Sequence, residues 1–118
     1  MAADYKELLV WQKSMKLAKE IYTLCELLPK KEQFALADQM RRAAISIPSN
    51  IAEGHARCSN KEFAYFLNVA NGSKAELETQ WLFGVEVGYF SNEQIKAALG
   101  LCTETSKMLQ ALKTAISS

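Results

Sequence analysis

The sequence is poor in residues that interrupt or cross-link a chain: its 118 residues include two prolines, five glycines and three cysteines. With so few helix-breaking residues, long helices are expected rather than many short strands. The cysteines are odd in number and far apart, at Cys25, Cys58 and Cys102, which argues against the disulfide framework of small secreted proteins. Cys25 and Cys102 fall on apolar helical faces, so we expect both thiols in the core.

Long apolar runs and a strong charge of one sign are also missing. No run of about 18 apolar residues occurs, so the sequence predicts no membrane-spanning helix. The first residues, 1–11, include Asp4 and Glu7 and lack the basic-then-apolar order of a signal peptide, so we expect a cytoplasmic protein. Lys and Arg total 14 and Asp and Glu 13, a net charge of +1 that would not by itself draw the chain to a polyanion.

Apolar residues recur at helical spacing in four segments, and 49% of the chain is hydrophobic. We predict an all-α fold with helices over about 5–28, 32–56, 59–89 and 91–116. Short connections between long helices favour an antiparallel up-down-up-down four-helix bundle, formed by residues 1–118 as one domain. Pro29 ends the first helix, whereas Pro48 lies inside the second and predicts a kink there.

Two sequence motifs predict where the last two helices begin. Ser59 with Glu62, and Ser91 with Gln94, have the spacing of capping boxes, in which each side chain bonds the free backbone amide of the other. Gly72 lies inside the third predicted helix, where glycine lowers helix stability by up to about 1 kcal/mol relative to alanine. A close approach of another helix at Gly72 would explain its presence.

The first and third helices carry more apolar surface than the interior of one bundle can cover. The first has two adjacent stripes, one with Met15 and Tyr22 and one with Leu17 and Ile21. Apolar surface left exposed typically marks an interface, so we expect contact between copies of the chain. The predicted apolar interface comprises Leu17, Ile21, Ile45, Tyr65, Val69, Phe83 and Val87.

Several segments resemble one bacterial family. These are residues 9–13 (LVWQK), the pair Leu28-Pro29, residues 39–54 (QMRRAAISIPSNIAEG) and residues 66–80 (FLNVANGSKAELETQ). They are similar to a four-helix-bundle family whose members include proteins encoded in intervening sequences of large-subunit ribosomal RNA genes. The resemblance covers most of the chain to about Tyr89, and the last helix matches only in pattern.

The resemblance implies a ring-like homopentamer, and no activity is established for most of the family. It also implies kinship with the accessory protein of diversity-generating retroelements, a basic pentamer that works with a reverse transcriptase and nucleic acid. This chain departs from that protein because its net charge is only +1.

Polar residues gather on one face of the second predicted helix, and two interpretations stay open. The face is either solvated or part of a hydrogen-bonded network across a subunit contact, with Arg42 donating to Glu53 of a neighbour or to Glu78. The resemblance favours the network. Its predicted members are Gln39, Arg42, Ser46, Asn50, Glu53 and Glu78.

A second set of residues would suit RNA or DNA if an assembly brought several copies of it together, because each contact with a phosphate adds to binding. Glu53 and Glu62 lie nearby and would weaken such a patch. The candidate nucleic-acid contacts are Lys13, Lys16, Arg41, Arg42, Arg57 and Lys61.

No motif predicts catalysis, a cofactor, a metal or a small-molecule substrate. His55 and Cys58 have an H-x-x-C spacing, but two ligands do not make a zinc site. Glu53 and His55 are two residues apart and point in different directions on a helix. We therefore expect a non-enzymatic, self-assembling bundle that acts as a scaffold or adaptor, with RNA as a candidate partner. The alternative is a nucleic-acid-binding module that uses Arg41, Arg42 and Arg57.

Overall fold

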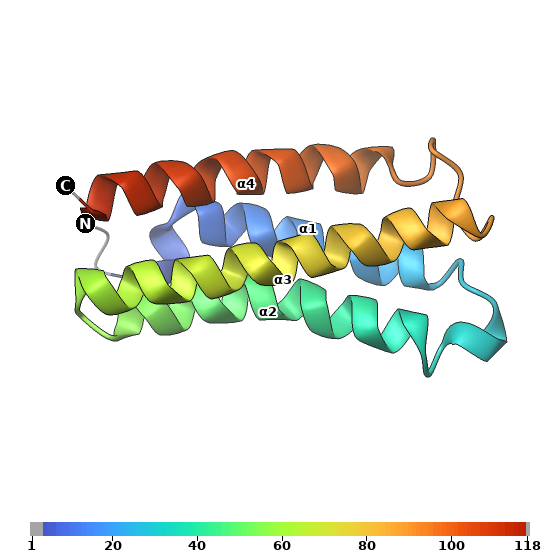
Figure 1. The fold of residues 1–118 in the computed structure, drawn as a ribbon, viewed down its shortest axis with the longest axis horizontal. Helices are drawn as coiled ribbons and strands as arrows, with labels where there is room; N and C mark the ends of the chain where they lie inside the picture. The colour runs from blue at the N-terminus through green and yellow to red at the C-terminus, as the bar shows by residue number, and fades with distance from the viewer. Residues whose placement is uncertain (1–3, 118) are drawn as a thin grey trace.

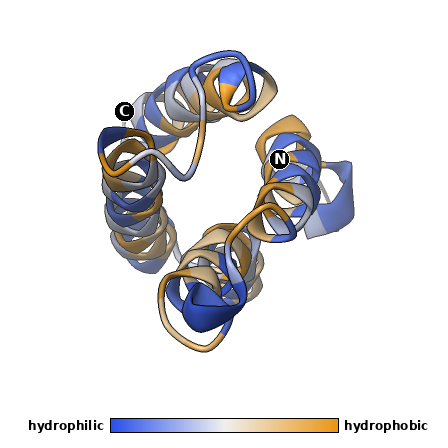
Figure 2. Cartoon of the chain, turned by 90° about the vertical axis from the view of Figure 1, so that its right-hand side faces the viewer, coloured by the Kyte–Doolittle hydropathy of each residue, from blue (hydrophilic) through white to orange (hydrophobic). Residues whose placement is uncertain are grey.

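The computed structural model describes residues 4–117, and the regular elements in this range are all helices (Figure 1). They are η1 (Tyr5–Glu7), α1 (Leu9–Cys25), η2 (Lys30–Glu32), α2 (Leu36–Ala56), α3 (Asn60–Glu86) and α4 (Lys96–Ser117). Consecutive long helices pack against each other and α1 also packs against α4, which closes a four-cornered bundle (Figure 2). This confirms the predicted all-α up-down-up-down fold. No helix in the described range is long and apolar enough to cross a membrane.

The first helix is shorter than predicted at both ends. Asp4 and Glu7 form a capping box around η1, and Leu8 is extended, so α1 begins at Leu9 instead of near residue 5. At the other end the Gln33 amide donates to the carbonyls of Cys25 (2.9 Å) and Leu28 (3.1 Å). These bonds satisfy carbonyls that a helix end leaves free, and α1 ends at Cys25.

The connection from α1 to α2 is longer than predicted. Pro29 is extended and leads into η2, and Ala35, with φ −124° and ψ −98°, separates η2 from α2. As a result α2 begins at Leu36 and not near residue 32. Phe34 lies in this connection, outside any helix, and its side chain is 95% exposed.

α2 runs unbroken through Pro48, as one helix and not two. Proline lacks the amide that would bond the carbonyl four residues earlier. Pro48 is buried, and Ile47 and Ile51 on either side of it are fully buried. The prediction of a single helix is confirmed, and the kink stays a prediction.

Side-chain caps mark the later helices as well. Ser59 accepts a bond from the amide of Glu62 at 3.3 Å, so this half of the predicted box is present at the start of α3. Both hydrogen bonds of the predicted Ser91–Gln94 capping box are present: the Ser91 amide donates to the Gln94 side chain (2.9 Å), and the Gln94 amide donates to the Ser91 hydroxyl (3.1 Å). They close a turn that precedes α4, because α4 begins only at Lys96. α3 ends at Glu86, short of residue 89, because Gly88 takes a positive φ of 87°.

The core is built from one apolar stripe of each helix, and its largest members include Trp81, Met40 and Leu77. On α1 the stripe that faces inward contains Leu17 and Ile21, both 0% exposed. Their placement in the predicted apolar interface is therefore wrong, because the other helices of the same subunit already cover them. The buried thiols of Cys25 and Cys102 agree with the predicted core positions.

Small residues set how closely the helices approach. A Cβ at Gly54 would lie 2.7 Å from Cβ of Phe66 and 3.0 Å from Cδ1 of Phe63, so α2 and α3 touch there. A Cβ at Gly84 would lie 2.6 Å from the ring of Phe90. Gly72 is different: it is exposed, and within residues 4–117 no other part of the structure comes within 4 Å of its Cβ position. The predicted close approach at Gly72 is wrong within the subunit.

Candidate functional site

Two sets of exposed large apolar side chains lie on the surface of the bundle, and Leu9, Leu27, Leu82 and Leu99 are exposed outside both sets. The first set, which we call the α1–α2 face, comprises Met15, Tyr22, Phe34 and Ile45. Met15 and Tyr22 are two helical turns apart on α1, and Phe34 lies in the connection between α1 and α2. The Arg41 guanidinium lies 5.9 Å from the centre of the Tyr22 ring, which joins α1 to α2 at the surface.

An open hollow of about 480 Å³ lies on this side of α2. It is lined by Tyr22, Asp38, Arg41, Arg42, Ile45 and Ser46. Arg41 also donates to the carbonyl of Gln33 at 3.0 Å, so its side chain is held in place. Among residues 4–117 no carboxylate lies within ion-pair distance of Arg41.

The second set, which we call the α3 stripe, comprises Tyr65, Val69, Phe83 and Val87. Tyr65 is 63% exposed, Phe83 56% and Val87 46%, while Val69 is half-buried. The spacings of four, fourteen and four residues keep these side chains on one side of α3. Both sets therefore offer apolar contact area that the subunit leaves uncovered. Ser46, which lines the hollow beside Ile45, bonds Ser73 on α3.

The predicted polar network is present only in part, and it lies within one subunit. The Ser46 and Ser73 hydroxyls are 2.8 Å apart, and the Asn50 amide donates to the carbonyl (2.7 Å) and hydroxyl (2.9 Å) of Ser46. This cluster links α2 to α3. The other predicted members are not joined to it, and Gln39 is exposed.

The charged members of that network have local partners. Arg42, whose side chain is 80% exposed, pairs with Asp38 at 3.0 Å rather than with Glu53 or Glu78 of the same chain. Glu53 pairs with Arg57 at 2.9 Å. Glu78 pairs with Lys74 at 3.4 Å beside the buried Cys102, and burial together with the Glu78 carboxylate raises the pKa of that thiol to about 12.

The candidate nucleic-acid residues do not form one patch on the subunit. Arg41 and Arg57 are sixteen residues apart on α2, about 24 Å along its axis. Arg57 bonds Glu53, lies 3.7 Å from Glu62 and stacks over the ring of Phe66. This guanidinium is thus neutralised locally, and the Glu53 hydrogen bond raises its pKa.

The lysines of the same set lie elsewhere on the surface. Lys13 on α1 pairs with Glu104 on α4 at 2.8 Å, and this ammonium lowers the pKa of the Glu104 carboxyl. Lys16 and Lys61 are exposed and form no ion pair within residues 4–117. The subunit alone therefore offers separate cations on separate helices, and half of them are already paired with carboxylates.

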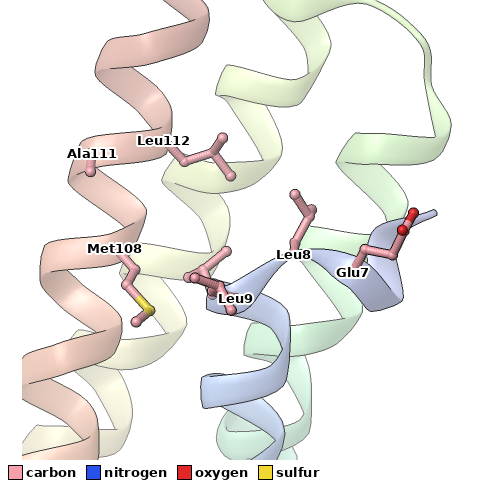
Figure 3. Close-up of a pocket in the computed structure, with 7 residues that line it drawn as sticks. Glu7, Leu8, Leu9, Met108, Ala111 and Leu112 are labelled. Carbon is pink, nitrogen blue, oxygen red and sulfur yellow. The ribbon is translucent and has the colours of Figure 1, made fainter. Parts of the chain in front are cut away.

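An apolar cavity of about 390 Å³ opens where the start of α1 meets the end of α4 (Figure 3). It is lined by Glu7, Leu8, Leu9, Val10, Met108, Ala111 and Leu112. Figure 3 shows Met108 and Leu112 facing Leu9 and Leu8, while the carboxylate of Glu7 points away from them. A binding pocket for a small molecule combines apolar walls with a few polar groups that fix the ligand, and here no polar group points inward.

The described residues contain no group of three or more His, Cys, Asp or Glu side chains that could hold a metal ion. His55 packs edge-on against Phe63, with ring centres 5.8 Å apart. Cys58 is exposed on the turn between α2 and α3. The arrangement of these residues thus provides apolar and charged contact surfaces, and it brings together no nucleophile with a base.

The fold and the sequence can be compared with known proteins. The sequence profile of the family described as 23S rRNA-intervening sequence protein matches residues 6–111. The chain belongs to this family. A crystal structure from Bacteroides thetaiotaomicron, that of a protein with unknown function from the S23 ribosomal protein family, matches with a TM-score of 0.81 and 27% identity. The match covers 89% of this chain and 98% of that one, and no curated protein matches.

In this member of the 23S rRNA-intervening sequence protein family, the sequence reasoning missed two surface residues. The predicted second helix, over about 32–56, includes Phe34, although this residue is out of step with the stripe that begins at Leu36. No sequence motif singles out Glu76. It is exposed between Val69 and Phe83 on α3, and within residues 4–117 it forms no ion pair.

Proposed function

We propose that this chain is a non-enzymatic scaffold that works as an assembly of several copies of itself. The observation that carries the proposal is the pair of uncovered apolar sides on a subunit whose core is already filled. Trp81, Leu17 and Met40 are 0% exposed, so the exposed residues are not a core that failed to close.

The apolar area is of the size that an interface uses. An aromatic side chain buries about 150–250 Å² when fully covered. Large side chains about half exposed on the α1–α2 face and the α3 stripe therefore offer several hundred Å² between them. A stable interface buries about 800 Å² per partner, and monomers rarely expose patches of more than about 300–600 Å².

A nucleic-acid partner, if there is one, would be a partner of the assembly. On the subunit Lys13, Arg42 and Arg57 already pair with carboxylates. Lys16, Arg41 and Lys61 have no carboxylate partner within residues 4–117. They would form a site for a polyanion only if an assembly brought several copies of them together. We therefore place the scaffold role first and RNA binding second.

Size-exclusion chromatography with light scattering tests self-assembly. We expect a mass that is a multiple of 13.2 kDa and falls on dilution. Ile45→Glu and Phe83→Glu should each reduce the assembly while the helical circular dichroism persists. Lys107→Glu, on the exposed side of α4, is the matched control and should leave the mass unchanged. A wild-type protein that stays at 13.2 kDa over the whole dilution series would overturn the proposal.

The RNA role is measured with the same proteins. Fluorescence anisotropy with a structured RNA at low and moderate salt should show binding by the wild-type assembly that weakens with salt. The dissociated Phe83→Glu variant should bind more weakly, although it keeps every basic residue. Equal binding by both proteins would instead place the RNA site on the subunit.

A further inference from the structure

We propose that the cavity between the start of α1 and the end of α4 is a docking site for an amphipathic helix of a partner protein. That helix has two apolar side chains one turn apart, with acidic residues before them and basic residues after them. The cavity lies outside both the α1–α2 face and the α3 stripe, so this docking does not depend on self-assembly. Three features define the partner: the apolar walls, the open side of the cavity and the charges around it.

The walls of the cavity are apolar and only partly covered by the subunit. Leu8 and Leu9 form the wall at the start of α1, and Leu9 is 68% exposed. Met108 and Leu112, one helical turn apart, form the wall on α4 (Figure 3). Val10, which is 4% exposed, also lines this hollow of about 390 Å³, so an inserted side chain would reach the core. Covering these walls with an apolar side chain removes them from water, which is favourable.

The open side of the cavity suits a second helix. Ala111 lies between Met108 and Leu112 in the sequence and is exposed, so its small side chain lets the backbone of a partner approach α4 closely. Residues 108–112 span about 6 Å along the axis, which is the distance between positions i and i+4 of another helix. A partner helix therefore sets two apolar side chains into the cavity, as in other helix-in-groove complexes. The flexible thioether of Met108 adapts to the shape of the inserted side chain.

Basic groups gather one helical turn beyond the cavity. Lys13 on α1 lies 2.8 Å from Glu104 on α4. This hydrogen bond and the charges of nearby Lys16 and Lys107 lower the pKa of the Glu104 carboxyl. Three ammonium groups therefore lie near one carboxylate, and Glu20 is a further turn along α1. The excess positive charge attracts acidic residues of a partner.

The side of the cavity beyond Leu8 is acidic. Asp4 and Glu7 are joined by the capping box around η1, and Lys6 pairs with Asp4 at 3.4 Å. The Glu7 carboxylate points away from the apolar walls (Figure 3), and it forms no ion pair in the part of the chain that the structure describes. Acidic and basic groups thus flank the apolar walls in different places. A helix with acidic residues in its first turn and basic residues in its last turn complements both, and this is also the order that a helix dipole favours.

A second copy of the chain fits the cavity less well than a convex partner does. Two copies related by a two-fold axis would place one hollow against the other and leave both unfilled. An amphipathic helix of about three turns fills the hollow but covers less than the about 800 Å² that each partner of a stable interface buries. We therefore expect weak and reversible binding.

Fluorescence anisotropy with a labelled peptide tests the site. The probe has about 15 residues and is mostly alanine for helicity, with glutamates in the first turn, leucines at positions i and i+4, and lysines in the last turn. It should bind the wild-type protein, and Leu9→Glu should weaken binding about tenfold or more, because one apolar wall becomes charged. An acid in the first turn of α1 suits the helix dipole, so this variant should stay folded by circular dichroism. Leu82→Glu, at an exposed leucine on α3, is the matched control and should bind as the wild type does.

Two further changes separate the apolar contribution from the charges. A peptide with both leucines replaced by serine keeps every charge and should bind at least about tenfold more weakly. Lys16→Glu and Lys107→Glu should each weaken binding of the leucine peptide about two- to fivefold at low salt, and added salt should reduce this effect.

The outcomes that overturn the docking site are distinct from those that concern self-assembly. The site is refuted if the wild type fails to bind the leucine peptide, or if Leu9→Glu binds it equally well. Equal binding of the serine peptide would also refute it, because the lysines would then attract acidic chains without the cavity. If Leu9→Glu lost assembly by light scattering while Leu82→Glu kept it, the cavity would belong to a contact between copies instead. A wild-type monomer that binds the leucine peptide would refute the proposed scaffold and support the docking site.

Discussion

Replacing Gly54 with alanine tests whether α2 and α3 are as close as the structure places them. Gly54 is buried in the last turns of α2, and an alanine Cβ would lie 2.7 Å from Cβ of Phe66. That carbon is attached directly to the backbone of α3, so it cannot swing aside as the end of a long side chain could. The two helices would have to separate.

The expected magnitude follows from two opposing effects. In a helix interior alanine is more favourable than glycine by about 1 kcal/mol. Forcing an extra carbon into a packed contact costs about 1–3 kcal/mol. At Gly100, inside α4, nothing lies within 4 Å of the Cβ position, so only the favourable effect operates. Gly54→Ala should therefore be less stable than Gly100→Ala by about 1–3 kcal/mol, which is the cost of the contact alone.

Urea unfolding followed by circular dichroism measures this difference. All proteins must be compared at one subunit concentration, because the proposed assembly would add a concentration-dependent stability. We expect Gly100→Ala to unfold at higher urea than the wild type and Gly54→Ala at lower urea than Gly100→Ala. If the two variants were equally stable, α2 and α3 would not be in contact at Gly54 and the reasoning would fail.

Two further predictions concern titratable groups. Ellman's reagent at about pH 8 should react promptly with Cys58 alone, and with Cys25 and Cys102 only after unfolding. The reason is that burial raises the pKa of both inner thiols. Prompt reaction of a second thiol in the folded protein would contradict this prediction. Lys13→Met should lower stability at about pH 7, and this effect should fade as the pH falls through the lowered pKa of Glu104. The lowered pKa of Glu104 means that its ion pair stabilises the fold only above that pKa, and an effect that persisted in acid would exclude the pair as its cause.

The helices and most of the core could be predicted because helical periodicity reports which side chains are buried. Met40, Ile47 and Ile51 on α2, and Leu67 and Trp81 on α3, recur at helical spacing, and all five are buried. The helix ends could not be predicted in the same way, because they depend on side chains that fold back on the backbone. For example, the side-chain amide of Gln33 donates to the carbonyl of Cys25, the last residue of α1, which lies eight residues earlier in the sequence. This spacing matches no short capping motif.

The candidate surfaces were harder to predict than the core. α1 carries two adjacent apolar stripes, and periodicity alone cannot say which of them the other helices cover. The structure buries the stripe with Leu17 and Ile21 and leaves Met15 and Tyr22 exposed. The charged residues show the same limit: Lys13 pairs with Glu104 across ninety residues of sequence, a partner that only the antiparallel packing of α1 beside α4 provides.

The segment 39–54, which carried most of the family resemblance, performs two separable tasks on α2. Ala43, Ala44 and Gly54 are small and buried, and they let α2 approach its neighbours closely. Packing within the subunit explains this half of the segment. Ile45 and Arg42 are exposed and contribute no core contact, so the stability of one subunit gives no reason for an isoleucine there. The proposed self-assembly would give an exposed isoleucine beside the hollow on α2 a role, and charging Ile45 should then reduce assembly and leave the helices folded.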